Sequence, residues 1–435
     1  MQLESPGMTL KKILTSCDIY LKKISLVLCV LLPFFQLRGR AIADLSILFI
    51  AISFLLYCIF EKHYRCLLRG WFPYALGLWG VIVASSAIHG STHAVLEAIA
   101  LLRYFVFAKA LEEWLLDSTQ KQQLLGLCVT LAGVWIICLC WEQYLVGVNP
   151  WGYPRWQDGA LTGPFFKPRA GPPLAIIMFP GLMIYPMRMV QKKELAQKLA
   201  GLALMSFLLL TMVMIGQRMP ALLVFFGFFL CAMLIKTTRV MVLLATLSGF
   251  VALALLPFIS PPSYDKLILR FFEQLGHFSQ SPYGQLYIRA LNMVHAHPLL
   301  GLGYNGFRAH CGETTYVYGI PQFAHMVAGQ DIGAGCTIHP HNTYLEIATT
   351  AGLSGLFLFV CVVLLWLKKL LLAALASRDL MQAMLFITVC MLFWPLASTS
   401  SLFTERTAGW VFLMVGWGLA RARLLGPAHA PQAGA

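Results

Sequence analysis

Stretches of about 20 mostly apolar residues recur along nearly the whole chain, and each is long enough to cross the hydrocarbon core of a bilayer as a helix. Hydrophobic residues make up 59% of the 435 positions and charged residues only 11%, against about a quarter charged residues in soluble domains. A soluble protein has no core large enough to bury so many apolar helices. The sequence therefore predicts an all-α polytopic membrane protein. About twelve transmembrane helices are expected, at 24–37, 42–60, 71–88, 93–111, 123–142, 173–187, 199–215, 219–235, 240–258, 344–366, 381–396 and 407–420.

The net charge of +14 is better explained by membrane topology than by nucleic-acid binding. When the N-terminus is placed in the cytoplasm, most Lys and Arg residues fall in short cytoplasmic loops, as the positive-inside rule requires. Twelve spans then return the C-terminus to the cytoplasm. The first apolar run lacks a small-residue cleavage site at its end, so we expect it to be retained as a span rather than removed as a signal peptide.

The expected spans divide the chain into four parts. Residues 1–258 hold the first nine helices and a short external segment at 143–172, and residues 344–423 hold the last three. Between them, residues 259–343 form a large external loop domain. The tail at 424–435 is rich in Pro, Gly and Ala and is expected to be disordered and dispensable.

The loop between the ninth and tenth spans is predicted to be partly helical. Residues 264–278 carry apolar side chains at helical spacing and are expected to lie along the membrane surface. Residues 283–295 form a second helix with Arg289 in its middle, and the glycine-rich turn GLGYNGF follows at 301–307. Long loops in compact proteins are usually functional, so we expect the protein to act at the external surface of the membrane.

Two cysteines, Cys311 and Cys336, lie in this external loop. An oxidising compartment would allow them to pair, and two unpaired thiols are an equally good interpretation of the sequence. No Cys-x-x-Cys motif and no Cys/His zinc spacing occurs in the chain. The external acids, among them Asp158, Asp265 and Asp331, form no Asp-x-Asp pair for a divalent cation.

The segment IHPHNTYLEIATTAGLSGL at 338–356 combines two histidines with the start of an apolar helix. His339 and His341 precede the tenth span, together with the amide of Asn342 and the hydroxyl of Tyr344. A histidine at this depth can orient a hydroxyl or take its proton near neutral pH. The alternative is that these are interfacial histidines that cap a helix, and composition alone does not separate the two interpretations.

His341-Asn342 followed by Gly352 and Gly355 resembles the signature of the O-antigen ligases. These belong to a superfamily with the O-antigen polymerases and the bacterial protein O-oligosaccharyltransferases. The stretch from Arg289 through HAHPLLGLGYNGF at 295–307 resembles a second pattern of that superfamily, and the resemblance covers roughly residues 205–420. It implies a GT-C-like membrane glycosyltransferase in the bacterial inner membrane, with its active site facing the periplasm.

The resemblance implies that a glycan moves from undecaprenyl diphosphate to an acceptor without metal, ATP or another cofactor. Arg218, in GQRMP, and Arg289 match the two arginines of the family that contact the diphosphate. Arginine suits this task because its planar fork binds phosphate oxygens bidentately. An ordinary loop charge for Arg218 and a solvated helix face for Arg289 are the alternatives. His341, or its neighbour His339, then matches the residue that orients the acceptor hydroxyl for an inverting displacement, supported by Asn342 and Tyr344.

Three further basic residues are less constrained by the sequence. Lys167 and Arg169, in GPFFKPRAGPP, either complete the diphosphate site or anchor to anionic headgroups. Arg103 lies within the expected fourth span, where a charge is costly unless it has a partner. For Arg103 we expect an ion pair with another helix.

The acceptor separates the candidate activities within the superfamily. A ligase joins O-antigen to the lipid A–core oligosaccharide, a polymerase extends a lipid-linked repeat, and a protein O-oligosaccharyltransferase modifies Ser or Thr. The His-Asn signature and the span layout favour the ligase. A transporter or lipid flippase is the alternative from another class, but the chain shows no two-half symmetry and few charges at the midplane of its spans.

Overall fold

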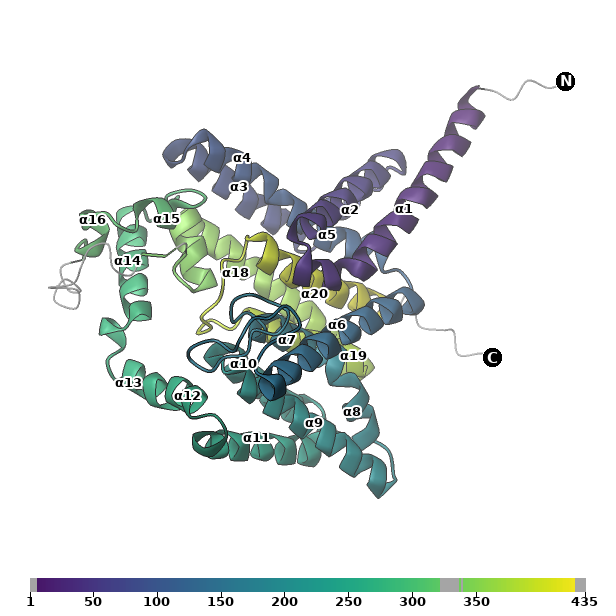
Figure 1. Ribbon diagram of the computed structural model, residues 1–435. Helices are drawn as coiled ribbons and strands as arrows, with labels where there is room; N and C mark the ends of the chain where they lie inside the picture. Colours follow the sequence, from purple (N-terminus) through teal and green to yellow (C-terminus); the bar gives the residue numbers. More distant parts are fainter. Residues whose placement is uncertain (1–5, 321–335, 338, 427–435) are drawn as a thin grey trace.

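The computed structural model describes residues 6–320, 336–337 and 339–426, with side chains from residue 18 onward. Regular secondary structure within these residues is helical (Figure 1). The α-helices are α1 (Pro6–Arg38), α2 (Arg40–Phe60), α3 (Phe72–His89), α4 (Thr92–Ala100), α5 (Leu102–Ala110), α6 (Thr119–Val146), α7 (Gly171–Ile177), α8 (Ile184–Val190), α9 (Leu195–Ile215), α10 (Arg218–Leu234), α11 (Arg239–Ile259), α12 (Pro261–Tyr264), α13 (Arg270–Gly276), α14 (Pro282–Ala296), α15 (Gly306–His310), α16 (Thr314–Val317), α18 (Thr343–Ser377), α19 (Leu380–Leu392) and α20 (Glu405–Leu424).

Six helices of the described part are long and apolar enough to cross a membrane. They are α2, α3, α6, α9, α18 and α11 with the short turn before it. The bent pair around α7 and α8 makes a seventh if it is one span, and α10 and α19 are shorter apolar helices. The predicted all-α membrane class is confirmed, and the count of twelve spans stays a prediction.

Two of the predicted spans are interrupted. The expected span at 173–187 is bent by 43° between α7 and α8, with a π-helical turn at Met178–Leu182 that contains Pro180. Proline lacks the N–H that a regular α-helix needs, which agrees with the π-helical turn around Pro180. The expected span at 93–111 is divided into α4 and α5 and ends in a π-helical turn at Leu111–Leu115. The two spans at these positions stay predictions.

The predicted loop helices are present in the structure. α14 covers the predicted helix at 283–295, and α12, a π-helical turn at Asp265–Leu269 and α13 cover 264–278. These helices form an arc beside the bundle in Figure 1. The arc closes on α18, because α14 packs against α18. The predicted disordered tail lies largely outside the described residues.

Arg103 and Lys109 form ion pairs inside the bundle. Arg103 Nε lies 3.0 Å from Oδ1 of Asp44 on α2, so the predicted ion pair with another helix is confirmed. Lys109 Nζ lies 2.9 Å from Glu112 and 2.7 Å from Glu113. Pairing removes most of the cost of placing such charges among apolar helices.

A kink in α18 joins the two glycine-containing motifs of the sequence. Gly352 has φ 65° and ψ −167°, a backbone conformation essentially restricted to glycine. A Cβ there would meet the Leu299 carbonyl carbon at 2.3 Å. The kink frees carbonyls of α18, and Thr349 O accepts a hydrogen bond from Leu302 N at 2.7 Å. In return, Leu353 N donates to Pro298 O at 2.7 Å, so the turn after α14 is fixed against α18.

Candidate functional site

The two histidines predicted from the sequence lie side by side at the start of α18, with ring centroids 4.3 Å apart. Both face the same backbone carbonyl. Nε2 of His339 lies 3.0 Å, and Nδ1 of His341 3.3 Å, from the oxygen of Thr399. Because a carbonyl oxygen only accepts hydrogen bonds, these two nitrogens carry the ring protons. Nδ1 of His339 and Nε2 of His341 are therefore left as proton acceptors.

The backbone around the histidines is fixed from both sides. His341 has a left-handed φ of 53°, and its carbonyl accepts a hydrogen bond from Thr399 N at 2.9 Å. The side chain of Asn342 caps α18 through the N–H groups of Tyr344 and Leu345. A non-glycine residue in this conformation costs about 1–3 kcal/mol, so the surrounding contacts must stabilise it.

Asn342 and Tyr344 also bind the segment that supplies Thr399. Asn342 Nδ2 donates to Pro395 O at 2.7 Å, and the Tyr344 hydroxyl donates to Phe393 O at 2.7 Å. Both polar groups are thus engaged with backbone carbonyls. Asn342 and Tyr344 thus hold the 393–399 segment against the start of α18.

Burial keeps both histidines neutral near pH 7. It lowers the pKa of His339 to about 4, and the neighbouring His341 lowers it further, against a small opposite effect of the Thr399 carbonyl. Burial also lowers the pKa of His341. Only the neutral ring can accept a proton from a hydroxyl, so both rings are in the form that this chemistry requires.

A small pocket opens beside His339. It is lined by Tyr304, Asn305, Phe307, His339, Pro340, Glu346, Thr350 and Phe403. Nδ1 of His339 is buried and has no hydrogen-bond partner in the described part of the chain. Its lone pair is therefore not used by the described part of the chain.

Glu346 is a pocket residue to which the sequence analysis assigned no role. Its carboxylate accepts hydrogen bonds from the Ser401 hydroxyl and from Leu402 N, the latter at 2.9 Å. Ser401 follows Thr399 by two residues. Glu346 therefore holds the segment whose Thr399 carbonyl contacts both histidines. The sequence feature that could have indicated Glu346 is an acidic residue in the first turn of an apolar helix, one turn after Asn342.

Arg218 is connected to His341 through Tyr283. It begins α10, and its guanidinium donates to Lys266 O and to Gln274 Oε1, each at 2.5 Å. Tyr283 connects the two residues, because it interacts electrostatically with Arg218 and its ring centroid lies 5.6 Å from that of His341. The structure thus brings Arg218 and His341 to one region.

Lys167 and Arg169 are exposed on the segment before α7. This segment contacts the turn that precedes α10, because Gln217 Nε2 donates a hydrogen bond to Pro168 O. Gln217 and Arg218 are consecutive, as are Pro168 and Arg169. The basic segment therefore lies next to the start of α10, and its role, completing the diphosphate site or anchoring to headgroups, stays a prediction.

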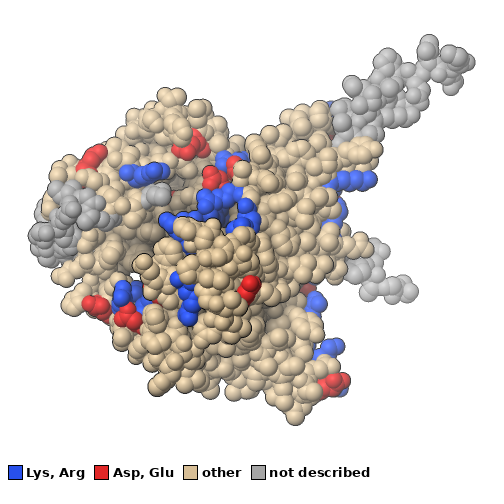
Figure 2. Space-filling view, viewed as in Figure 1, with Lys and Arg blue, Asp and Glu red and all other residues tan. Residues whose placement is uncertain are grey.

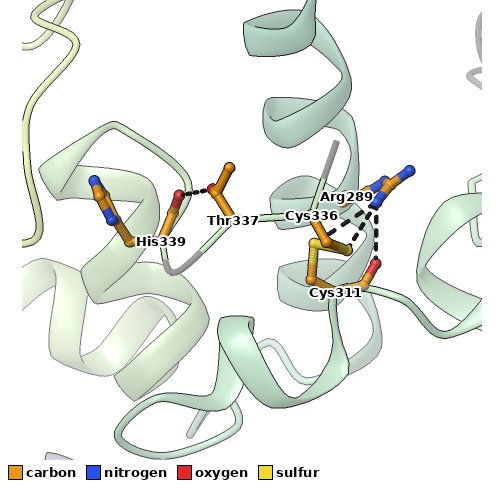
Figure 3. Close-up of a disulfide and its surroundings, with 5 residues drawn as sticks. All are labelled: Arg289, Cys311, Cys336, Thr337 and His339. Atoms are coloured by element: carbon orange, nitrogen blue, oxygen red, sulfur yellow. Dashed lines mark hydrogen bonds between the residues drawn. A yellow bond between two sulfur atoms is a disulfide. The ribbon is translucent and has the colours of Figure 1, made fainter. Parts of the chain in front are cut away.

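Arg289 lies elsewhere, buried against a disulfide (Figure 3). Cys311 and Cys336 are joined, which decides between the two interpretations of these cysteines. Arg289 Nη1 lies 2.9 Å from Cys336 Sγ and 3.4 Å from Cys311 O. In Figure 3 Cys336 and Thr337 lie between Arg289 and His339.

Residues 202–360 match the family model for O-antigen ligase. This segment of the chain is therefore similar to the O-antigen ligase family. The match runs from α9 into α18 and includes Arg218, Arg289 and both histidines. No curated protein matches the chain.

This match supports a membrane glycosyltransferase of the ligase or polymerase type. Substrates of this family are, in general terms, a lipid-linked glycan and a lipid acceptor. Thr399 and Ser401 lie beyond the matched residues, although they hold the histidines and Glu346. The histidine site therefore depends on a C-terminal segment outside the family match.

Proposed function

We propose that this member of the O-antigen ligase family transfers O-antigen polysaccharide from undecaprenyl diphosphate to the lipid A–core oligosaccharide. The reaction takes place on the periplasmic face of the inner membrane, with both termini in the cytoplasm. The observation that carries the proposal is the pair of neutral histidines held on the Thr399 carbonyl. They offer two proton acceptors at the mouth of α18, where a lipid-linked sugar and an acceptor sugar can meet.

The reaction is a single displacement. A hydroxyl of the acceptor sugar donates a hydrogen bond to Nε2 of His341, or to Nδ1 of His339, and attacks the anomeric carbon of the donor. The new C–O bond forms as the bond from that carbon to the diphosphate oxygen breaks, and the configuration inverts. The hydroxyl proton passes to the histidine, and general base assistance of this kind contributes about 10²–10⁴ in rate.

The leaving diphosphate gains charge as the bond breaks, and fixed cations stabilise that charge best. We assign this role to Arg218, with Lys167 and Arg169 on the adjoining segment. The contact between Gln217 and Pro168 supports this grouping. The polyprenyl tail of the donor lies between spans.

Arg289 enters the proposal in two ways. The family resemblance predicts a contact between Arg289 and the donor phosphate. Its position supports a role in holding the loop, because it contacts the disulfide three residues before His339. Loss of Arg289 would then disturb the histidine site through the loop.

Lipopolysaccharide banding in a ligase-null bacterial host tests this proposal. We expect the wild-type gene to restore the O-antigen ladder, and His341→Ala to lose it at equal expression. A deletion strain should accumulate full-length polymer on undecaprenyl diphosphate. Accumulation of single repeats would instead indicate a polymerase and contradict the ligase assignment.

A further inference from the structure

Three arginines from distant parts of the chain converge beside the histidine pocket. Arg40 begins α2, Arg169 precedes α7 and Arg406 lies in the first turn of α20. Arg169 interacts electrostatically with Arg40, and Arg406 interacts with both. Figure 2 shows Lys and Arg side chains gathered at the centre of this face of the molecule.

Direct contacts between their elements support this convergence. The guanidinium of Arg406 lies 5.5 Å from the ring of Phe165, on the segment that carries Arg169. Arg38, two residues before Arg40, donates to Pro164 O of the same segment at 2.9 Å. A Cβ at Gly409 would meet the side chain of Gln36 at 1.6 Å. The start of α20 therefore packs directly against the end of α1, next to Arg40.

The charges of these three arginines are not balanced by the protein. Among the described residues, no carboxylate forms an ion pair with Arg40, Arg169 or Arg406. Glu405 acts on Arg406 electrostatically without an ion pair. Nη1 of Arg406 is buried and lacks a hydrogen-bond partner in the described part.

The charged groups around Arg218 differ from this cluster. There, Lys266 pairs with Asp158 at 2.6 Å and Arg270 pairs with Asp265 at 2.7 Å. Like charges held together without counterions repel one another, and a bound anion relieves that repulsion. The cluster of Arg40, Arg169 and Arg406 thus has the charge of an anion site.

Phosphate is the anion that fits this arrangement. Guanidinium groups bind phosphate oxygens bidentately, and the N-terminal ends of α2 and α20 also favour negative charge. Phe403, which lines the pocket at His339, precedes Arg406 by three residues. A phosphate bound here would belong to a molecule whose sugar reaches that pocket.

We propose that Arg40, Arg169 and Arg406 form a phosphate-binding subsite for a lipid-anchored substrate of the transfer reaction. Arg40, Arg169 and Arg406 all lie outside the residues that match the family model. The inference rests on the proposed function for its substrates. Two sources carry the required phosphate ester, namely the diphosphate of the donor and the phosphorylated lipid A of the acceptor.

Binding of defined lipids to the full-length protein in phosphatidylcholine nanodiscs tests the subsite. The probes are undecaprenyl diphosphate, bisphosphorylated lipid A and phosphatidylglycerol. The variants are Arg406→Gln, Arg40→Gln combined with Arg406→Gln, and Arg406→Lys. Arg188→Gln is the matched control, because Arg188 is exposed on α8, away from this cluster. Thermal unfolding of each variant verifies its fold, and Arg406→Lys separates loss of charge from loss of folding.

We expect the double variant to bind one of the first two probes at least about ten-fold more weakly, as loss of charged hydrogen bonds predicts. Arg406→Lys should retain most of the affinity, and Arg188→Gln all of it. Loss for undecaprenyl diphosphate identifies the donor as the source, and loss for lipid A identifies the acceptor. Unchanged binding of both, or an equal loss for phosphatidylglycerol, would overturn the proposal. Because the assay needs no transfer, the subsite can stand even if the proposed ligase activity fails.

Discussion

The carbonyl oxygen of Thr399 lies 3.0 Å from Nε2 of His339, across 60 residues of sequence. The same oxygen accepts a hydrogen bond from His341. The Thr399 carbonyl therefore fixes the tautomer of both histidine rings. The second nitrogen of each ring carries no proton and lies on the side of the ring away from this carbonyl. This arrangement makes the 393–404 segment part of the candidate site.

The acid limb of the pH–activity profile should lie below pH 6.5. Burial lowers the pKa of His339 to about 4 and also lowers that of His341. Each ring therefore stays neutral to a lower pH than an exposed histidine. Transfer rates measured from pH 4 to 8 in detergent check this. A loss of activity centred at or above pH 6.5 would contradict the neutral-histidine account.

The stability of the protein should fall as the pH falls from 6.5 toward 4. In this window the unfolded chain protonates His339 before the folded protein does, so protons favour unfolding. His339→Asn removes this contribution, and its unfolding temperature should depend less on pH than that of the wild type. Identical pH dependence of thermal unfolding in the two proteins would show that His339 is not buried in the neutral form.

Glu346→Ala should reduce the transfer rate by about ten-fold or more. It should also move the acid limb of the pH–activity profile to higher pH. Without the carboxylate, Ser401 and Leu402 lose their acceptor, and the Thr399 carbonyl no longer fixes the histidines. Leaving the Leu402 N–H without its acceptor costs about 1–3 kcal/mol. Glu346→Gln keeps an acceptor for Leu402 and should be milder.

Glu194→Ala is the control for Glu346, because Glu194 is exposed and bonds only locally to Gln197 among the described contacts. It should leave the rate and the pH profile unchanged. A Glu346→Ala enzyme with lower activity but an unaltered pH profile would indicate a general structural role instead of histidine positioning.

Gly352→Ala should destabilise the protein by about 1–3 kcal/mol or more, since its positive φ strains any other residue. Its new Cβ would also press on the Leu299 carbonyl. Gly80→Ala is the matched control in α3, where a Cβ meets nothing within 4 Å. Thermal unfolding of the two variants in detergent compares them. Equal unfolding temperatures would show that the kink in α18 is not required.

Replacing both Cys311 and Cys336 with Ser should lower stability by about 2–4 kcal/mol, the usual effect of a disulfide. It should also reduce transfer, because the disulfide lies three residues before His339. Peptide mapping without reductant should recover the Cys311–Cys336 pair from the wild type. Recovery of two free thiols from protein in an oxidising compartment would contradict the pairing.

The sequence predicted those parts of the site that follow from local pattern. The apolar runs indicated the membrane helices, and the His-Asn motif indicated the histidines at the start of α18. The partner of Arg103 was expected on another helix, because a charge among apolar spans needs one.

What the sequence did not reveal depends on contacts between distant segments. Thr399 acts through its backbone carbonyl, which any residue would supply, so its type carries no signal. Arg40 and Arg406 stand among many charges at helix ends, and only the fold brings them to Arg169. The bend between Leu182 and Ile184 was missed because the apolar run continues through it.

Glycosidic bond formation by the purified protein tests the central claim most directly. The assay combines polymer on undecaprenyl diphosphate with lipid A–core in detergent, and compares wild type with His341→Ala and His339→Ala. We predict polymer joined to lipid A–core by the wild type, and a loss of about 100-fold or more in at least one histidine variant. Full activity in both variants, or no product from the wild type with either lipid acceptor or lipid-linked repeats, would contradict the account.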